Sequence, residues 1–236
     1  MRTLGIVGGT GPDSTAEYYR TIVEISRARA AGGYPRILIT SVSSVEGTRV
    51  IELVSADRRR ELVARLLAEL RTLEAAGAEI GLLASNTLHV VFDELQTVSP
   101  IPLVSIVEAA AEAATGSVRL GLFATTFTIR ADLYRPVFAR RGIEVVAPSA
   151  MDQELIHRAY FEELTAGMFL PVTRDRLLDI ADRMVAAHDL DGIILGGTEL
   201  PLLLPEESRT GLRFLDTSRI HAEAVVARLL DLDDFA

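Results

Sequence analysis

Short apolar runs that alternate with helical patterns are the feature that most constrains the fold of this 236-residue chain. Such nearly continuous apolar strands are typical of a parallel sheet whose two faces are covered by helices. The alternation therefore predicts an α/β fold. In the first part of the chain, the expected strands are Thr3–Val7, Arg36–Val42, Ile80–Ala84 and Leu103–Ile106, with an amphipathic helix over Arg58–Ala75.

The same order of elements begins again near residue 98. Further strands are expected at Arg119–Phe123, Ile143–Val146 and Gly192–Leu195, and a long helical region is expected over Gln153–His188. The segment Arg213–Glu223 is interpreted as a strand followed by a capped helix. We therefore expect two similar Rossmann-like domains, each a parallel sheet flanked by helices, with the active-site cleft between them.

The absence of two residue types limits the chemistry. The chain has no cysteine, and no lysine occurs in the sequence, so arginine is the only strongly basic side chain. A pyridoxal-phosphate enzyme needs a lysine for its Schiff base, and thiol-based proton transfer needs cysteine. Catalysis would therefore have to use His, Asp, Glu, Tyr, Ser or backbone dipoles, without a cofactor.

Charge and patterning exclude further classes of function. The formal net charge of −9 argues against general nucleic-acid binding, which draws on a basic field. The N-terminal apolar run turns at Gly8 and Gly9 before a membrane span could form, so we expect a soluble cytoplasmic protein without a membrane partner. His157, His188 and His221 show no metal-binding spacing, so they are expected to serve helix surfaces or core hydrogen bonds, and no metal site is predicted.

Two segments place small polar residues directly after a predicted strand. The first is Ser85-Asn86-Thr87-Leu88-His89, and the second is Gly196-Gly197-Thr198-Glu199. A strand that ends in such residues and then passes into a helix presents backbone N–H groups to an anion. Ligands bind at these strand ends in parallel α/β sheets, so we expect both segments to belong to a site.

These segments, with the opening Leu4–Pro12 and the Thr-rich turn Ala124–Thr128, resemble the aspartate/glutamate racemase superfamily. Members of that superfamily typically carry Cys-Asn-Thr in the first segment and Gly-Cys-Thr-Glu in the second. Ser85 and Gly197 stand at the two cysteine positions here. The chain is thus identified as a divergent amino-acid racemase family member that lacks both catalytic cysteines.

The resemblance implies an N-terminal domain of residues 1–97 plus 211–236, in which the last helix packs, and a C-terminal domain of residues 98–210. It further implies a homodimer and a pyridoxal-phosphate-independent isomerase that binds a small amino or dicarboxylic acid. Ordinary two-cysteine racemisation is not possible without the thiols. The alternatives are related enolate chemistry, as in a lyase, cyclase or decarboxylase, and a catalytically inactive carboxylate-binding regulator.

The substrate-binding roles follow from the same resemblance, position by position, whereas the family's proton-transfer roles do not carry over. Ser85, His89 and Glu199 are the candidate catalytic groups, although Ser85 would need a strong neighbouring base and the other two have structural alternatives at the start of a helix. For Asn86 and Thr87 the alternative to a substrate contact is a role as helix caps. The expected substrate-binding residues are Thr10, Arg49, Asn86, Thr87, Thr125, Thr128 and Thr198.

Overall fold

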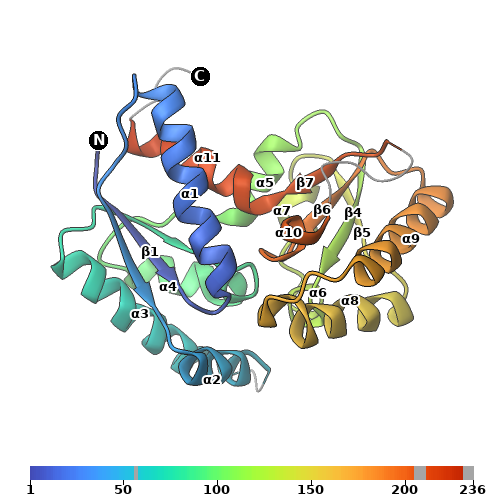
Figure 1. Cartoon of the computed structure of the whole chain (residues 1–236), viewed down its shortest axis with the longest axis horizontal. Coiled ribbons are helices and arrows are strands. Elements are labelled where there is room, and N and C mark those ends of the chain that lie inside the picture. Colours follow the sequence, from blue (N-terminus) through green and yellow to red (C-terminus); the bar gives the residue numbers. More distant parts are fainter. Residues whose placement is uncertain (56–57, 205–210, 231–236) are drawn as a thin grey trace. The chain divides into compact units, whose positions relative to one another are not determined.

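The computed structural model describes residues 1–55, 58–204 and 211–230, and the chain forms two compact units (Figure 1). The first unit comprises Met1–Ile106 and the described residues from Ser218 onward. The second unit comprises Val107–Thr217. Each unit has its own parallel sheet, which confirms the predicted fold class. Within the described part of the chain, no helix is both long and apolar enough to cross a membrane.

The sheet of the first unit has β1 (Leu4–Gly8) at its centre, between β2 (Ile37–Ser41) and β3 (Ile80–Leu83). Both pairings are parallel, and Ile6 of β1 lies opposite Ile39 of β2 and Leu82 of β3. The predicted strand at Leu103–Ile106 is wrong. Only an isolated parallel bridge between Gly81 and Leu103 forms there, because Pro102 has no N–H to donate and helix α5 (Ile106–Ala113) begins within the predicted range.

Helices cover both faces of this sheet. Leu4 and Ile6 of β1 share a buried cluster with one side of α1 (Pro12–Arg29) and with α11 (Thr217–Leu229). Gly5 faces the other way, where a side chain would meet Leu73 of α3 (Arg59–Ala75). The last helix therefore packs within the first unit, as expected. The residues that α3 buries are Leu62, Leu66, Leu70 and Leu73, a stripe at helical spacing.

The second unit has a four-stranded parallel sheet in the order β5-β4-β6-β7 (Figure 1). Its strands are β4 (Arg119–Ala124), β5 (Glu144–Val146), β6 (Gly192–Gly196) and β7 (Phe214–Asp216). The elements outside this sheet include α6 (Thr126–Arg130), α7 (Arg135–Ala139), α8 (Ala150–Glu162), η2 (Leu164–Ala166), α9 (Pro171–His188) and α10 (Leu200–Leu203). A buried cluster unites Phe123 of β4 and Ile193 of β6 with Ile156 and Tyr160 of α8.

The remaining helices of the first unit are α2 (Ser44–Ser55), η1 (Thr87–Val91) and α4 (Phe92–Val98).

Two further expectations differ from the structure. The long helical region Gln153–His188 is three helical segments. Helix α8 ends at Glu162, the short 3₁₀ helix η2 is closed by Gly167 with a positive φ of 72°, and Pro171 starts α9 at a position where its missing N–H costs nothing. Residues 211–217 were expected in the first domain. They belong instead to the second unit, where Leu215 of β7 pairs with Ile194 of β6.

A glycine turn connects β1 to α1. The Thr15 hydroxyl accepts a hydrogen bond from the Gly9 N–H at 3.0 Å and donates to the Gly11 carbonyl at 2.9 Å. Gly9 has φ +91°, and a Cβ there would lie 2.4 Å from both the N and the O of Val42. Only glycine fits this turn, because any side chain would push the backbone that follows β2 away from it.

We expect Gly9→Ala to lower the free energy of unfolding by at least about 2 kcal/mol, through backbone strain plus the clash with Val42. Gly32→Ala is a matched control, because Gly32 has nearly the same φ, +90°, but no atom within 4 Å of an added Cβ. Its loss should be about 1 kcal/mol. Urea unfolding of both variants measures the difference, and equal losses would contradict the steric explanation.

Candidate functional site

The loop after β3 buries a series of polar side chains in the first unit. Ser85, Asn86, Thr87 and His89 are each less than one-tenth exposed, and the backbone passes from β3 into the short 3₁₀ helix η1. A buried polar group is costly unless it is hydrogen-bonded, so each of these side chains needs a partner in the folded unit. The loop therefore forms a layer of buried polar side chains at the carboxyl ends of the strands.

His89 fixes this loop through both of its ring nitrogens. Nδ1 lies 2.8 Å from the Ser85 carbonyl oxygen, and Nε2 lies 3.2 Å from the backbone N of Ile106. A carbonyl can only accept and a backbone N–H can only donate, so Nδ1 carries the proton and Nε2 accepts. The ring is neutral, because burial lowers the pKa of His89 to about 4. The imidazole predicted as a catalytic base is engaged at both nitrogens by backbone groups.

A second buried histidine supports the same layer. His221 of α11 lies with Nε2 2.9 Å from the Val104 carbonyl and Nδ1 2.9 Å from the Tyr18 hydroxyl. Its ring meets that of His89 edge to face, with 6.0 Å between the ring centroids. Burial, and then the nearby His89, lower the pKa of His221 to about 3. His221 thus serves a core hydrogen bond, as the sequence predicted.

The two remaining predicted contacts of the first unit are Thr10, which belongs to the glycine turn, and Arg49, which belongs to α2. Thr10 is partly buried, and Gly47 of α2 approaches it, since an added Cβ would be 3.8 Å from its Cα. Arg49 lies on α2, but its side chain is outside the described residues. The helix that carries it is held in place by polar contacts at its start.

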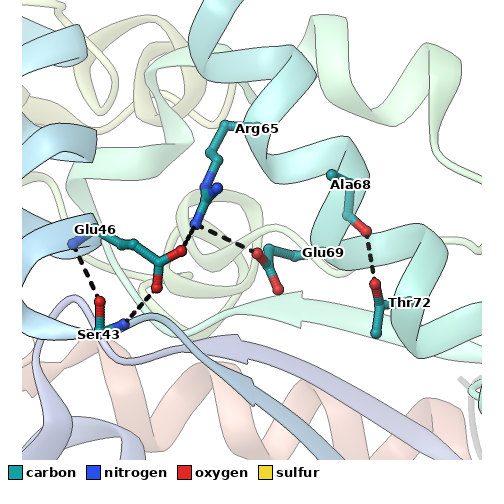
Figure 2. Close-up of polar contacts among 6 residues, drawn as sticks. All are labelled: Ser43, Glu46, Arg65, Ala68, Glu69 and Thr72. Atoms are coloured by element: carbon teal, nitrogen blue, oxygen red, sulfur yellow. Dashed lines mark hydrogen bonds and ion pairs between the residues drawn. The ribbon is translucent and has the colours of Figure 1, made fainter.

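Figure 2 shows those contacts. Glu46 accepts a hydrogen bond from the Ser43 N–H at 2.9 Å, while its own N–H donates to the Ser43 hydroxyl at 3.4 Å, which is a capping box. The Arg65 guanidinium of α3 contacts the same carboxylate and lies 3.8 Å from Glu69. Hydrogen bonds from Ser43 and Arg65 lower the pKa of Glu46 to about 2. The start of α2 is thereby fastened to α3.

In the second unit, the turn after β4 carries two of the predicted threonines. Thr125 caps α6, because its hydroxyl accepts from the Thr128 N–H at 3.3 Å and lies 3.2 Å from the Thr128 hydroxyl. Both side chains are fully buried. Thr125, predicted as a substrate contact, therefore serves as a helix cap.

Beside this turn lies His157 of α8, which sequence reasoning assigned to no site. Its Nδ1 is 3.2 Å from the Thr126 hydroxyl and 3.4 Å from the Thr126 backbone N. The ring packs edge to face on Phe127 and Phe161, at 5.2 and 4.9 Å between centroids. Its spacing of four residues from Phe161 on one helix was the signal that the two side chains share a face.

Three polar side chains are in direct contact at the loop after β6, two from the loop itself and one from α8. The Thr198 hydroxyl donates to Glu199 Oε2 at 2.8 Å, and the Tyr160 hydroxyl donates to the same oxygen and lies 3.4 Å from Thr198 Oγ1. All three residues are buried, with Glu199 2% exposed. The sequence predicted Thr198 and Glu199 but gave no role to Tyr160, which comes from α8.

Position 197 has no room for a side chain. A Cβ built on Gly197 would lie 2.6 Å from Cε2 of Tyr160 and 3.3 Å from Cδ1 of Leu200. Real Cβ atoms essentially never approach another heavy atom to 2.6 Å, so the Tyr160 ring would have to move. Ser85, by contrast, already carries a side chain of nearly the size of cysteine.

The predicted residues thus form separate clusters within each unit. Among the residues that the structure describes, no group of three or more His, Asp or Glu side chains could hold a metal ion. The polar side chains described in the loops after β3, β4 and β6 are hydroxyls, the Asn86 amide, the His89 imidazole and the Glu199 carboxylate. Such neutral donors bind carboxylate groups, and a buried carboxylate is suited to accept a proton or to bind an ammonium group.

Two parallel sheets with buried polar loops at the carboxyl ends of their strands define a racemase-like α/β protein. The family model for Asp/Glu/hydantoin racemases matches residues 7–225, and the chain belongs to that family. A proposed Asp/Glu racemase from Yersinia pestis has a structure with a TM-score of 0.84 and 30% identity, covering 98% of this chain and 100% of that one.

Two more relatives support this assignment. The structure of an aspartate racemase homologue from Pyrococcus horikoshii matches with a TM-score of 0.79 and 31% identity, over 98% of this chain and 100% of that one. The broad-specificity amino-acid racemase RacX from Bacillus subtilis is 22% identical, over 96% of this chain and 98% of its own length. Membership of the family, which the sequence predicted, is thereby confirmed.

The two buried histidines predict a loss of stability in mild acid. Both pKa values are depressed in the folded state, whereas an unfolded histidine titrates near 6.5, so unfolding takes up protons as the pH falls from about 6.5 towards about 4. Each histidine should contribute roughly 1.4 kcal/mol per pH unit in this window, with full stability above it. We expect His89→Gln to reduce the pH slope of the urea-unfolding free energy, with the exposed His188→Gln as control. Equal slopes for the wild type and His89→Gln would contradict this origin.

Reintroducing a thiol should be tolerated at only one of the two positions. Ser85→Cys is nearly isosteric and should change the free energy of unfolding by less than about 1 kcal/mol. Gly197→Cys should lower it by about 1 to 3 kcal/mol, because the Tyr160 ring must shift. The loss caused by Gly197→Cys should be smaller when Tyr160→Leu is already present. Thermal or urea unfolding measures this, and an equal loss in both backgrounds would count against the clash.

Proposed function

We propose that this chain is an isomerase-class enzyme of the Asp/Glu racemase family that acts on a small amino or dicarboxylic acid without thiols and without pyridoxal phosphate. One observation carries the proposal: buried polar side chains stand at the carboxyl ends of the strands in each sheet, among them Asn86, Thr125 and Thr198. Buried polar groups of this kind are expensive to keep unless they also serve a ligand or a fixed network. Membership of the racemase family favours the first of these reasons, a bound ligand.

The proposed substrate contacts are neutral donors. The predicted binding residues Asn86, Thr87 and Thr198 would donate to substrate carboxylate oxygens, and the enolate-like intermediate formed by loss of an α-proton would be stabilised by the same preorganised dipoles. Thr10, Thr125, Thr128 and Arg49 remain candidates for the rest of the acid. The Ser85 hydroxyl is a donor in this scheme, because the neighbouring His89 imidazole is engaged at both ring nitrogens by backbone groups.

The proposed base is Glu199. It is the only carboxylate among the predicted site residues, and it lies in the loop after β6 at the position where the family motif continues past its cysteine. His89 is better suited to positioning, because both ring nitrogens are engaged by the backbone. With one proton carrier, exchange, decarboxylation, elimination or cyclisation is easier than a racemisation that needs a carrier on each face.

A catalytically inactive carboxylate-binding regulator is the second candidate. The engagement of His89 and the lack of thiols favour it, because a binding protein needs the donors and no proton carrier. Such a protein would bind the acid and leave its α-proton in place. The two functions therefore differ in a single measurable reaction.

The experiment pairs calorimetry with proton NMR in deuterated water, using both enantiomers of aspartate and of glutamate. We expect binding of at least one acid together with replacement of its α-proton by deuterium, and an exchange rate that falls by more than about 100-fold in Glu199→Gln. Exposed Glu154→Gln on α8 is a matched control for the loss of one charge. Binding without exchange would favour the regulator, and neither binding nor exchange would contradict both candidates.

A further inference from the structure

Tyr160 occupies the volume that a side chain at position 197 would need. Its ring carbon Cε2 is 2.6 Å from the site of a Cβ on Gly197. The ring is only 7% exposed and packs edge to face on Phe161, with 5.4 Å between centroids, so it has little freedom to turn away. A large residue at 160 and glycine at 197 therefore fit together as a pair.

The hydroxyl of Tyr160 donates a hydrogen bond to the Glu199 carboxylate. Tyr160 and Thr198 both donate to Oε2 of Glu199, one from α8 and the other from the loop itself. A carboxylate buried this deeply would be unstable as an anion without hydrogen-bond donors. The two hydroxyls supply donors from two directions and fix the orientation of the Glu199 side chain.

The phenol itself is unsuited to carry a proton in the reaction. Burial, followed by the charge of Glu199, raises the pKa of Tyr160 well above its usual value of 10.0. The hydroxyl therefore stays protonated and acts as a donor throughout. Of these two side chains, Glu199 is therefore the one that would accept and return a substrate proton.

We propose that Tyr160 is the positioning residue of the second unit, which fills the place of the side chain absent at 197 and holds Glu199 as the proton acceptor. The inference rests on the proposed function. In the step, the substrate α C–H bond breaks, its proton goes to a Glu199 carboxylate oxygen, and the electron pair stays on the substrate as an enolate. Return of the proton from Glu199 to carbon reverses the step.

The test follows α-proton exchange of aspartate and glutamate in deuterated water as a function of pH, in the wild type and in Tyr160→Phe. We expect kcat to fall about 10- to 100-fold with KM changed little, because the acid still binds while its proton acceptor is misplaced. The pH profile should also differ from that of the wild type, because Tyr160 donates to the carboxylate that accepts the proton.

Tyr134→Phe is the matched control. It also removes a buried phenol hydroxyl in the same unit, one that bonds Thr217, and its side chain is 1% exposed. We expect its exchange rate and pH profile to match the wild type. A general effect of losing a buried hydroxyl would appear in both variants, whereas the proposed role appears in Tyr160→Phe alone.

A second measurement needs no substrate. The stability losses of Tyr160→Phe and Glu199→Gln should be non-additive in the double variant, because the two side chains share one hydrogen bond. Additive losses would overturn the inference, as would an unchanged kcat and pH profile in Tyr160→Phe with Glu199→Gln inactive. The latter result would leave the proposed function standing, whereas a wild type that exchanges no α-proton would refute the function and this role with it.

Discussion

Parallel pairing around the two central strands, β1 and β4, is the constraint on which both polar loops depend. In a parallel sheet all carboxyl ends lie at one edge, so the residues that follow neighbouring strands are brought together whatever their separation in sequence. The register Phe123 to Leu195 and Ala124 to Gly196 places the turn after β4 beside the loop after β6. In the first sheet, the pairing of Val7 with Leu83 does the same for the glycine turn and the Ser85 loop.

The two buried histidines of the first unit are stabilised by hydrogen bonds rather than by charge. His89 uses both ring nitrogens on backbone groups, and His221 bridges Tyr18 and Val104. Each such bond is worth only about 1 kcal/mol net, but an unpaired partner in the interior would cost more. Turning either ring would therefore leave a backbone group or a ring nitrogen without its partner.

The sequence predicted most of the fold because strand and helix periodicities are local properties. The apolar runs predicted β1 to β6 to within one residue at each end. The run Leu103–Ile106 was wrongly predicted as a strand, because an apolar run before a helix has the same composition as a strand. The break at Gly167 was visible in sequence but was masked by the strong helical pattern on both sides. The assignment of residues 211–217 failed for another reason, because the partner of an edge strand depends on tertiary pairing.

The candidate site was predictable only where neighbours in sequence are also neighbours in space. Thr198 and Glu199 follow β6 directly, so the motif located them, and Thr125 follows β4 in the same way. Tyr160 joins Glu199 across 39 residues and the His89 ring meets Ile106 across 17, and no local pattern encodes such contacts. Side-chain pairing between elements therefore had to come from the structure.

The absence of a thiol at 197 is coupled to its surroundings rather than being an isolated deletion. Simple loss of a side chain from a packed core leaves a cavity, which destabilises in proportion to its volume. Here the ring of Tyr160 fills the space, and its hydroxyl reaches the adjacent carboxylate, so packing and hydrogen bonding are both satisfied with glycine in place. A cysteine introduced at position 197 alone would clash with the Tyr160 ring. The residue types at positions 160 and 197 therefore constrain each other. With glycine at 197, the polar group that this loop buries beside Tyr160 is the Glu199 carboxylate.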